Sequence, residues 1–221
     1  MNCKKWIVRA CLGFVKLPGL LPVLLLLKPR VILQKGAKRR LPNPGILVSN
    51  HKSLMDFVLY LLIFPFQTIR FLMAEVLFQK GKVFASFLYA IGGIKVDRDG
   101  KDFGFVSDSI EVLDGGGILG VFPEGRLPIG GKPWPFTAST AYIATHADAP
   151  IIPIYTDGNY GFFRRANVVI GAPFDIKELC RTDEPEQEQL QRLTDLLQKK
   201  VYDLKAELEH KDEANDTNKN T

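Results

Sequence analysis

Short apolar runs alternate with longer helical segments along most of this chain, and this alternation limits the possible folds more than any other feature. The clearest run is 118–122, a continuous apolar stretch that follows three glycines and precedes Pro123. Such runs are typical of buried strands. The predicted strands are 46–48, 69–74, 94–96, 118–122, 151–155 and 168–170, and the predicted helices are 54–66, 76–91, 103–113, 137–146 and 186–209. Strands that alternate with helices predict an α/β fold, with a central, mostly parallel sheet flanked by helices.

The chain divides into three parts by composition. With 221 residues it fits one domain of ordinary size, which we place at residues 41–209. Residues 1–40 are predicted to form a membrane-associated helical segment with a basic flank. Residues 210–221 contain no apolar side chain larger than that of Ala214, and this polar composition predicts a disordered tail.

The apolar stretch 6–27 near the amino terminus has several possible explanations. A signal peptide is disfavoured because Arg9 and Lys16 interrupt the apolar part and no small-residue cleavage site follows. A spanning helix needs roughly 20 apolar residues, and Pro18 and Pro22 also break this one. Short helices that lie in one leaflet fit best, with the two charged side chains reaching the headgroups. A true span and a buried core helix remain alternatives.

Charge is distributed unevenly along the chain. Eleven Lys or Arg residues precede Asp56, and no Asp or Glu does. Because the basic end is also the most apolar end, it favours an anionic membrane surface over nucleic acid as a partner. We therefore expect association with membrane lipids at the cytoplasmic face, where basic flanks are enriched, and no nucleic-acid binding.

The three cysteines, Cys3, Cys11 and Cys180, have no spacing typical of a metal site, and none lies near a histidine. They are interpreted as free thiols in a reducing compartment. We therefore expect no metal site built from these cysteines, and we expect no cofactor.

The sharpest candidate site is the segment 50–56, which contains His51 and Asp56 and follows the predicted strand 46–48. Residues five apart in one continuous helix point about 140° away from each other. The two side chains therefore meet only if His51 lies in a loop and Asp56 in the first turn of the next helix. Ser53 and Asp56 have the spacing of a capping box, which predicts that arrangement. Asp56 would then orient the imidazole, leaving its other nitrogen to accept a proton from a hydroxyl. The alternative is that Asp56 only caps the helix and His51 is an ordinary loop residue.

Three further blocks carry candidate residues. Residues 92–98 end in Arg98, residues 122–126 read Phe-Pro-Glu-Gly-Arg, and residues 149–154 form an apolar strand with two prolines. Arg126 could bind a phosphate through two hydrogen bonds, and Glu124 could accept one from a substrate hydroxyl. Taken singly, each arginine is better explained by an ordinary surface ion pair.

Taken together, the order and spacing of these four blocks resemble the motifs of the glycerolipid, or lysophospholipid, acyltransferase family over residues 45–154. The resemblance implies that His51 and Asp56 are the catalytic pair. It also implies that Arg98, Glu124, Gly125 and Arg126 bind the phosphate or polar head of the acyl acceptor. Residues 41–209 would then be an acyltransferase domain.

The implied reaction moves a fatty acyl group from acyl-CoA or acyl carrier protein to a lysophospholipid hydroxyl, 1-acylglycerol-3-phosphate being the favoured acceptor. The thioester is a co-substrate, and the reaction needs no metal. The alternative functions are a lipid-binding protein of the same fold without turnover, or a thioesterase-like enzyme in which His51 activates water. The sequence does not determine the oligomeric state.

Overall fold

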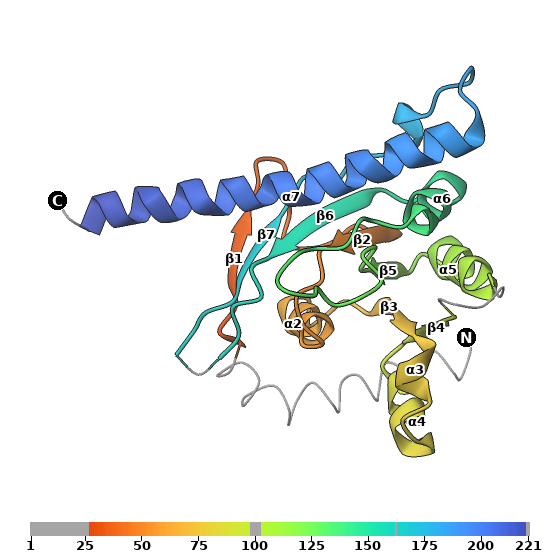
Figure 1. Ribbon diagram of the computed structural model, residues 1–221, viewed down its shortest axis with the longest axis horizontal. Helices are drawn as coiled ribbons and strands as arrows, with labels where there is room; N and C mark the ends of the chain where they lie inside the picture. The colour runs from red at the N-terminus through yellow and green to blue at the C-terminus, as the bar shows by residue number, and fades with distance from the viewer. Residues whose placement is uncertain (1–26, 98–102, 162, 220–221) are drawn as a thin grey trace.

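The structure is a computed structural model that describes residues 27–97, 103–161 and 163–219 (Figure 1). Within these residues, seven strands form one sheet in the order β1-β7-β6-β2-β5-β3-β4. Their bounds are β1 Arg30–Leu33, β2 Gly45–Ser49, β3 Ile69–Ala74, β4 Ile94–Val96, β5 Ile118–Val121, β6 Ile151–Thr156 and β7 Asn167–Ile170. Strands β6, β2, β5, β3 and β4 run parallel, β7 is antiparallel to β6, and β1 is parallel to β7. The predicted α/β fold with a mostly parallel sheet is therefore confirmed.

Helices cover both faces of this sheet (Figure 1). Their bounds are α2 Asp56–Ile63, α3 Glu75–Phe78, α4 Lys82–Ala90, α5 Gly104–Asp114, α6 Ala138–His146 and α7 Glu186–Lys219, with a short 3-10 turn at Lys177–Leu179. Helix α2 packs on one face through a core cluster that includes Leu47 and Ile152. Helices α5, α6 and α7 pack on the other face over Ile46, Val48 and Ile151. Successive residues of β2 thus enter opposite cores, which explains why its sequence is apolar without alternation.

The structure corrects three expectations. Residues 30–33, assigned by the sequence to a helical segment, form strand β1, because Val31 and Ile32 pair with β7 along the sheet edge. The single helix predicted over 76–91 is two helices, because Gly81 has a φ of 137° and ends the helical path between α3 and α4. The tail predicted to be disordered from residue 210 is helical as far as Lys219, since no Gly or Pro interrupts the chain after Glu186.

Most of the predicted amino-terminal membrane segment, residues 1–26, lies outside the described residues. Among the helices that the structure does describe, none is both long enough and apolar enough to cross a membrane.

A stack of aromatic rings leads from the core to the carboxyl end of β5. Phe71 on β3 fills the space above Gly120, where an added Cβ would lie 2.3 Å from the ring. The Phe71 ring stacks in turn on Phe122, with ring centroids 5.7 Å apart. Because a larger residue at position 120 would displace Phe71, the glycine fixes the position of Phe122 and of whatever packs against it.

Candidate active site

The site begins where β2 leaves the centre of the sheet. The Asn50 side chain is fully buried there and pairs with the backbone of Thr156 at the end of the neighbouring strand β6. Its Nδ2 donates to the Thr156 carbonyl at 2.8 Å, and its Oδ1 accepts from the Thr156 N–H at 2.8 Å. Asn50 thus continues the pairing of the two strands with a side chain and fixes the start of the loop that carries His51.

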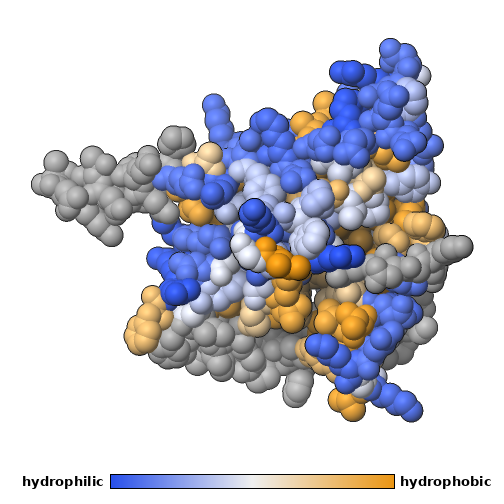
Figure 2. Space-filling model, in the orientation of Figure 1, coloured by the Kyte–Doolittle hydropathy of each residue, from blue (hydrophilic) through white to orange (hydrophobic). Residues whose placement is uncertain are grey.

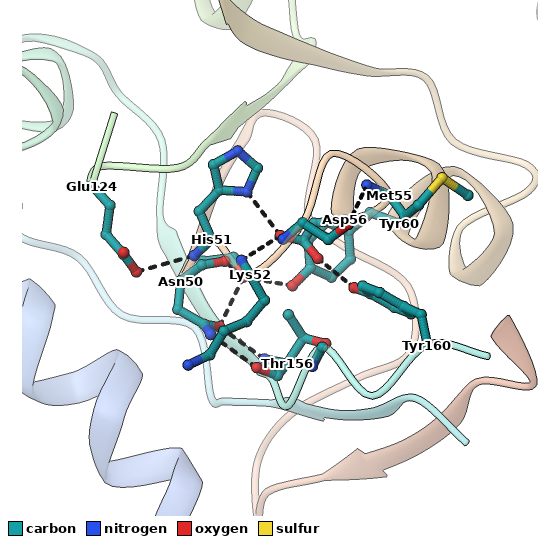
Figure 3. A network of polar contacts seen from close by, with 12 residues as sticks. Asn50, His51, Lys52, Met55, Asp56, Tyr60, Glu124, Thr156 and Tyr160 are labelled. Carbon is teal, nitrogen blue, oxygen red and sulfur yellow. Dashed lines mark hydrogen bonds and ion pairs between the residues drawn. The ribbon is translucent and has the colours of Figure 1, made fainter. Parts of the chain in front are cut away.

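His51 and Asp56 meet, with His51 in a loop and Asp56 in the first turn of the next helix, as the sequence predicts. The Nδ1 atom of His51 lies 2.8 Å from the Oδ2 atom of Asp56. His51 lies in the loop after β2, and Asp56 is the first residue of α2 (Figure 3). The hydroxyl of Ser53 accepts from the Met55 N–H at 3.2 Å, and the Ser53 N–H donates to Asp56 Oδ2 at 2.9 Å. The predicted capping box is wrong: the N-cap of α2 is Met55, which makes no side-chain cap hydrogen bond, and Asp56 is the first and not the third residue of the helix. The Asp56 N–H donates to the Ser53 backbone carbonyl and not to its hydroxyl.

Asp56 is completely buried and accepts from four donors. Oδ2 accepts hydrogen bonds from the imidazole of His51, from the Lys52 N–H at 2.6 Å and from the Ser53 N–H. Oδ1 accepts a hydrogen bond from the hydroxyl of Tyr160, which lies in the loop between β6 and β7. A buried carboxylate surrounded in this way is held in one orientation, and its negative charge is directed at the imidazole.

Two residues hold the imidazole of His51, one at a face of the ring and one at an edge. One face stacks on Phe122, with ring centroids 4.4 Å apart and ring planes 18° from parallel. The edge that carries Nδ1 faces Asp56, and the edge that carries Nε2 points away from it (Figure 3). The side chain keeps 13% of its surface exposed, and Nε2 has no partner among the described residues. This nitrogen is therefore the one that a substrate can reach.

Glu124 connects the His51 loop to two other segments. Its Oε1 accepts from the His51 N–H at 3.0 Å and from the Tyr202 hydroxyl at 2.9 Å, and its Oε2 accepts from the Trp134 N–H at 3.2 Å. The side chain is buried, with 3% of its surface exposed. Within the described residues both oxygens of Glu124 are thus engaged by protein donors, so its contacts hold the backbone of the histidine loop against β5 and α7.

Gly125 and Arg126 form the turn that follows Glu124. Gly125 has a φ of 63°, in the region that favours glycine, and its N–H donates to the Phe122 carbonyl at 2.9 Å. The turn exposes Arg126, whose guanidinium lies 5.6 Å from the centre of the Trp134 ring. Arg126 also lines a cavity of about 510 Å³ together with Ala74, Glu75, Val76, Gln79, Val96 and Asp97. Arg98 lies outside the described residues.

The sequence interpretation missed three residues of this site, namely Asn50 in its pairing role, Tyr160 and Tyr202. Asn50 stands next to His51, so its place at the end of a buried strand was a usable signal. Tyr160 lies six residues after the block 149–154 and Tyr202 lies in the predicted helix 186–209, and no pattern in the sequence marks either hydroxyl as part of the site.

Two phenols beside Asp56 remain protonated. Burial, and secondly the charge of Asp56, raises the pKa of Tyr160 and also that of Tyr60 well above the usual range for tyrosine. Burial and the neighbouring Glu124 do the same for the pKa of Tyr202. The hydroxyls of Tyr160 and Tyr202 therefore donate to Asp56 and Glu124, while the Tyr60 hydroxyl contacts the hydroxyl of Ser49.

Three comparisons identify the family to which such a site belongs. A family model described as Acyltransferase matches residues 32–157. The chain is 26% identical over 180 residues to 1-acyl-sn-glycerol-3-phosphate acyltransferase of Bacillus subtilis, a match that covers 78% of this chain and 87% of that protein. It is 28% identical over 133 residues to 1-acyl-sn-glycerol-3-phosphate acyltransferase alpha of Mus musculus, covering 59% of this chain and 47% of the mouse protein.

The solved structure of the 1-acyl-sn-glycerophosphate (LPA) acyltransferase from Thermotoga maritima has a similar fold. It superposes with a TM-score of 0.61 at 24% identity, covering 92% of this chain and 81% of that one. The histidine and carboxylate blocks lie inside the matched region 32–157, and the resemblance to glycerolipid acyltransferases is confirmed. The chain belongs to the acyltransferase family.

Proposed function

We propose that the protein transfers a fatty acyl group from acyl-CoA or acyl carrier protein to a lysophospholipid hydroxyl, with 1-acylglycerol-3-phosphate as the favoured acceptor in phospholipid biosynthesis. The observation that carries the proposal is the His51–Asp56 contact at 2.8 Å, which leaves Nε2 of His51 accessible. In a member of the acyltransferase family, an oriented imidazole with one accessible nitrogen is suited to deprotonate an alcohol. The named activity of the relatives supports the choice of acceptor.

The proposed reaction is a direct transfer. Nε2 of His51 accepts the proton of the acceptor hydroxyl as its oxygen attacks the thioester carbonyl, while Asp56 stabilises the imidazolium. The new carbon–oxygen bond forms, the carbon–sulfur bond breaks, and the imidazolium returns its proton to the departing thiolate. The products are the acylated lipid and a free thiol, so protons and charges balance without any other reactant.

The test offers one acyl-CoA to the purified protein with a panel of acceptors: lysophosphatidic acid, glycerol 3-phosphate and uncharged or zwitterionic lysolipids. Product masses identify the acceptor, and free thiol is measured in parallel. Thiol release that requires the acceptor and matches product formation supports transfer. Equal thiol release without acceptor identifies the thioesterase alternative, and no release with any acceptor identifies a lipid-binding protein.

We propose that Arg126 contacts the phosphate of the acceptor, because it is exposed at the turn after Glu124 and lines the 510 Å³ cavity. Replacing it with glutamine should raise the KM for the phosphorylated acceptor by about tenfold or more, since it removes a charge-assisted hydrogen bond. The KM for acyl-CoA should change little. The matched control is Arg181→Gln, at an exposed arginine before α7. An unchanged acceptor KM in Arg126→Gln would remove Arg126 from the acceptor site.

We further propose that the protein associates with the cytoplasmic face of a membrane and that α3 and α4 take part. Figure 2 shows hydrophobic side chains at the surface in this region of the molecule. The exposed apolar and aromatic residues there are Val76, Val83, Phe84, Phe87 and Tyr89. Lys80 and Lys82 lie among them, and residues 76–93 contain no Asp or Glu. Exposed apolar side chains beside uncompensated lysines fit an anionic lipid surface.

The double substitution Val83→Asp with Phe84→Asp should weaken binding to phosphatidylglycerol vesicles by about tenfold or more, because two side chains lose their contact with lipid. Co-sedimentation measures the partition, and activity on detergent-dispersed acceptor checks the active site. The control is Leu179→Asp, which adds one negative charge in place of two at an exposed residue before α7, away from α3 and α4. Unchanged sedimentation of the double variant would exclude α4 from the membrane contact.

A further inference from the structure

We infer that Tyr160 is a positioning residue of the active site, which holds the Asp56 carboxylate from the side opposite His51 and thereby sets how strongly Asp56 acts on the imidazole. The inference deepens the acyl transfer proposed above and rests on it. Tyr160 lies beyond the region that the family model matches, which ends at residue 157.

The two oxygens of Asp56 accept hydrogen bonds from different parts of the chain. Oδ2 accepts from three donors that all lie within residues 51–53, in the same loop. Oδ1 accepts from Tyr160, which lies 104 residues away in the sequence. In the part of the chain that the structure describes, no second hydrogen bond to Oδ1 is present. Among the described residues, the Tyr160 hydroxyl is therefore the only group that holds the second oxygen of the carboxylate in place.

Hydrogen bonds and close packing fix the loop that carries Tyr160. Asp157 Oδ1 accepts from the Asn159 N–H at 2.9 Å and from the Asn167 N–H at 3.0 Å, which joins the two ends of the loop. Gly158 lies against Lys52, and a Cβ at position 158 would come within 2.5 Å of the Lys52 Cβ. This close approach places the β6–β7 loop next to the loop that carries His51. The packing of the two loops therefore positions the Tyr160 phenol against Asp56.

The surroundings of Tyr160 make it a donor at every working pH. The phenol is partly buried in the core cluster beneath α2, and burial followed by the charge of Asp56 raises its pKa. The other titratable or charged groups near this carboxylate are His51 and Tyr60, with Glu124 bonded to the His51 backbone and Lys52 on the same loop. Since Tyr160 does not ionise, it donates to Asp56 over the whole pH range of an activity assay.

Removing this donor has a defined electrostatic consequence. In Tyr160→Phe the carboxylate of Asp56 loses one of the hydrogen bonds that stabilise its negative charge. The carboxylate then interacts more strongly with a protonated imidazole. A larger fraction of the enzyme then carries His51 in the form that cannot accept the proton of the acceptor. The acid limb of the kcat/KM profile should move to higher pH, and kcat at neutral pH should fall by about tenfold, the order expected for one hydrogen bond to a charged group.

The experiment compares the pH profiles of the wild-type protein, Tyr160→Phe and Tyr142→Phe. Tyr142 is a partly buried tyrosine on α6 that stacks on His146, so its variant loses a hydroxyl of the same kind away from the site. We expect the shift of the acid limb and the loss of kcat in Tyr160→Phe alone, with the KM for the acceptor nearly unchanged. A fall in kcat without any shift of the acid limb would overturn the inference, and so would an unchanged kcat.

A second measurement does not depend on turnover. The proton between His51 Nδ1 and Asp56 gives a downfield resonance in the full-length protein, which Asp56→Asn identifies by its loss or displacement. Tyr160→Phe should move this resonance, and Tyr142→Phe should not. If the wild-type protein acylates no acceptor, the proposed function fails, while the resonance still decides whether Tyr160 acts on the pair. A resonance that does not move in Tyr160→Phe would overturn the inference whatever the activity.

Discussion

Replacing His51 with alanine should reduce acyl transfer by about 10²–10⁴-fold, the usual contribution of a general base, while the protein remains folded. The imidazole supplies the only nitrogen that both faces solvent and is oriented by Asp56 in the described site. Its loss leaves the Phe122 ring uncovered on one side but breaks no strand or helix. The measurement is product formation at saturating acceptor, with the unfolding temperature recorded in parallel.

The matched control for this change is His146→Ala. His146 is exposed at the end of α6, where its ring stacks on Tyr142, so the control removes an imidazole remote from Asp56. We expect wild-type activity for His146→Ala. If purified His51→Ala kept near-normal turnover, general-base catalysis by His51 would be excluded, since no other described residue occupies this position.

Asp56→Asn should affect both activity and stability, which separates it from the histidine variant. An amide offers one acceptor oxygen in place of two, while four donors converge on this buried group. At least one donor would then face the amide NH₂. Each buried donor left without an acceptor should cost about 1–3 kcal/mol in the free energy of unfolding. Turnover should fall by a factor on the order of 10²–10⁴, because the imidazole loses the carboxylate that orients it and stabilises its charged form.

Denaturant unfolding and initial rates measure the two effects of Asp56→Asn. The control is Asp148→Asn, at an almost fully exposed aspartate whose only ion pair among the described residues is a 3.5 Å contact with Lys177. That variant should match the wild type in both measurements, because exposed ion pairs contribute little to stability. An Asp56→Asn protein as stable as the wild type would show that the four contacts do not hold the native loop.

The strands of the core and the His51–Asp56 contact could be predicted from the sequence because both depend on local patterns. A continuous apolar run such as 118–122 identifies a buried strand, and a loop that passes into a helix between His51 and Asp56 lets the two side chains meet. The identity of the sheet neighbours and the role of Glu124 could not be predicted in this way. They depend on contacts such as that between Glu124 and Tyr202, which are 78 residues apart.

Local patterns also failed where tertiary contacts override them. The edge strand β1 has only four residues, precedes the basic residues 35–40 and becomes a strand through its pairing with β7. The apolar residues of 76–91 follow a helical period, but one glycine with a positive φ divides the segment. Tyr160 left no periodic signal, because its position is determined by the closure of a loop and not by a regular element.

The links that run from Asp56 to Tyr160 and from Glu124 to Tyr202 have a practical consequence for choosing where to cut this protein. The family match stops at residue 157, before either phenol. A fragment excised at that boundary would retain every motif residue yet leave two buried carboxylates facing empty space where hydroxyls now donate. The carboxyl-terminal third thus contributes two hydroxyl donors to the candidate active site, and that site extends beyond the stretch by which the family is recognised.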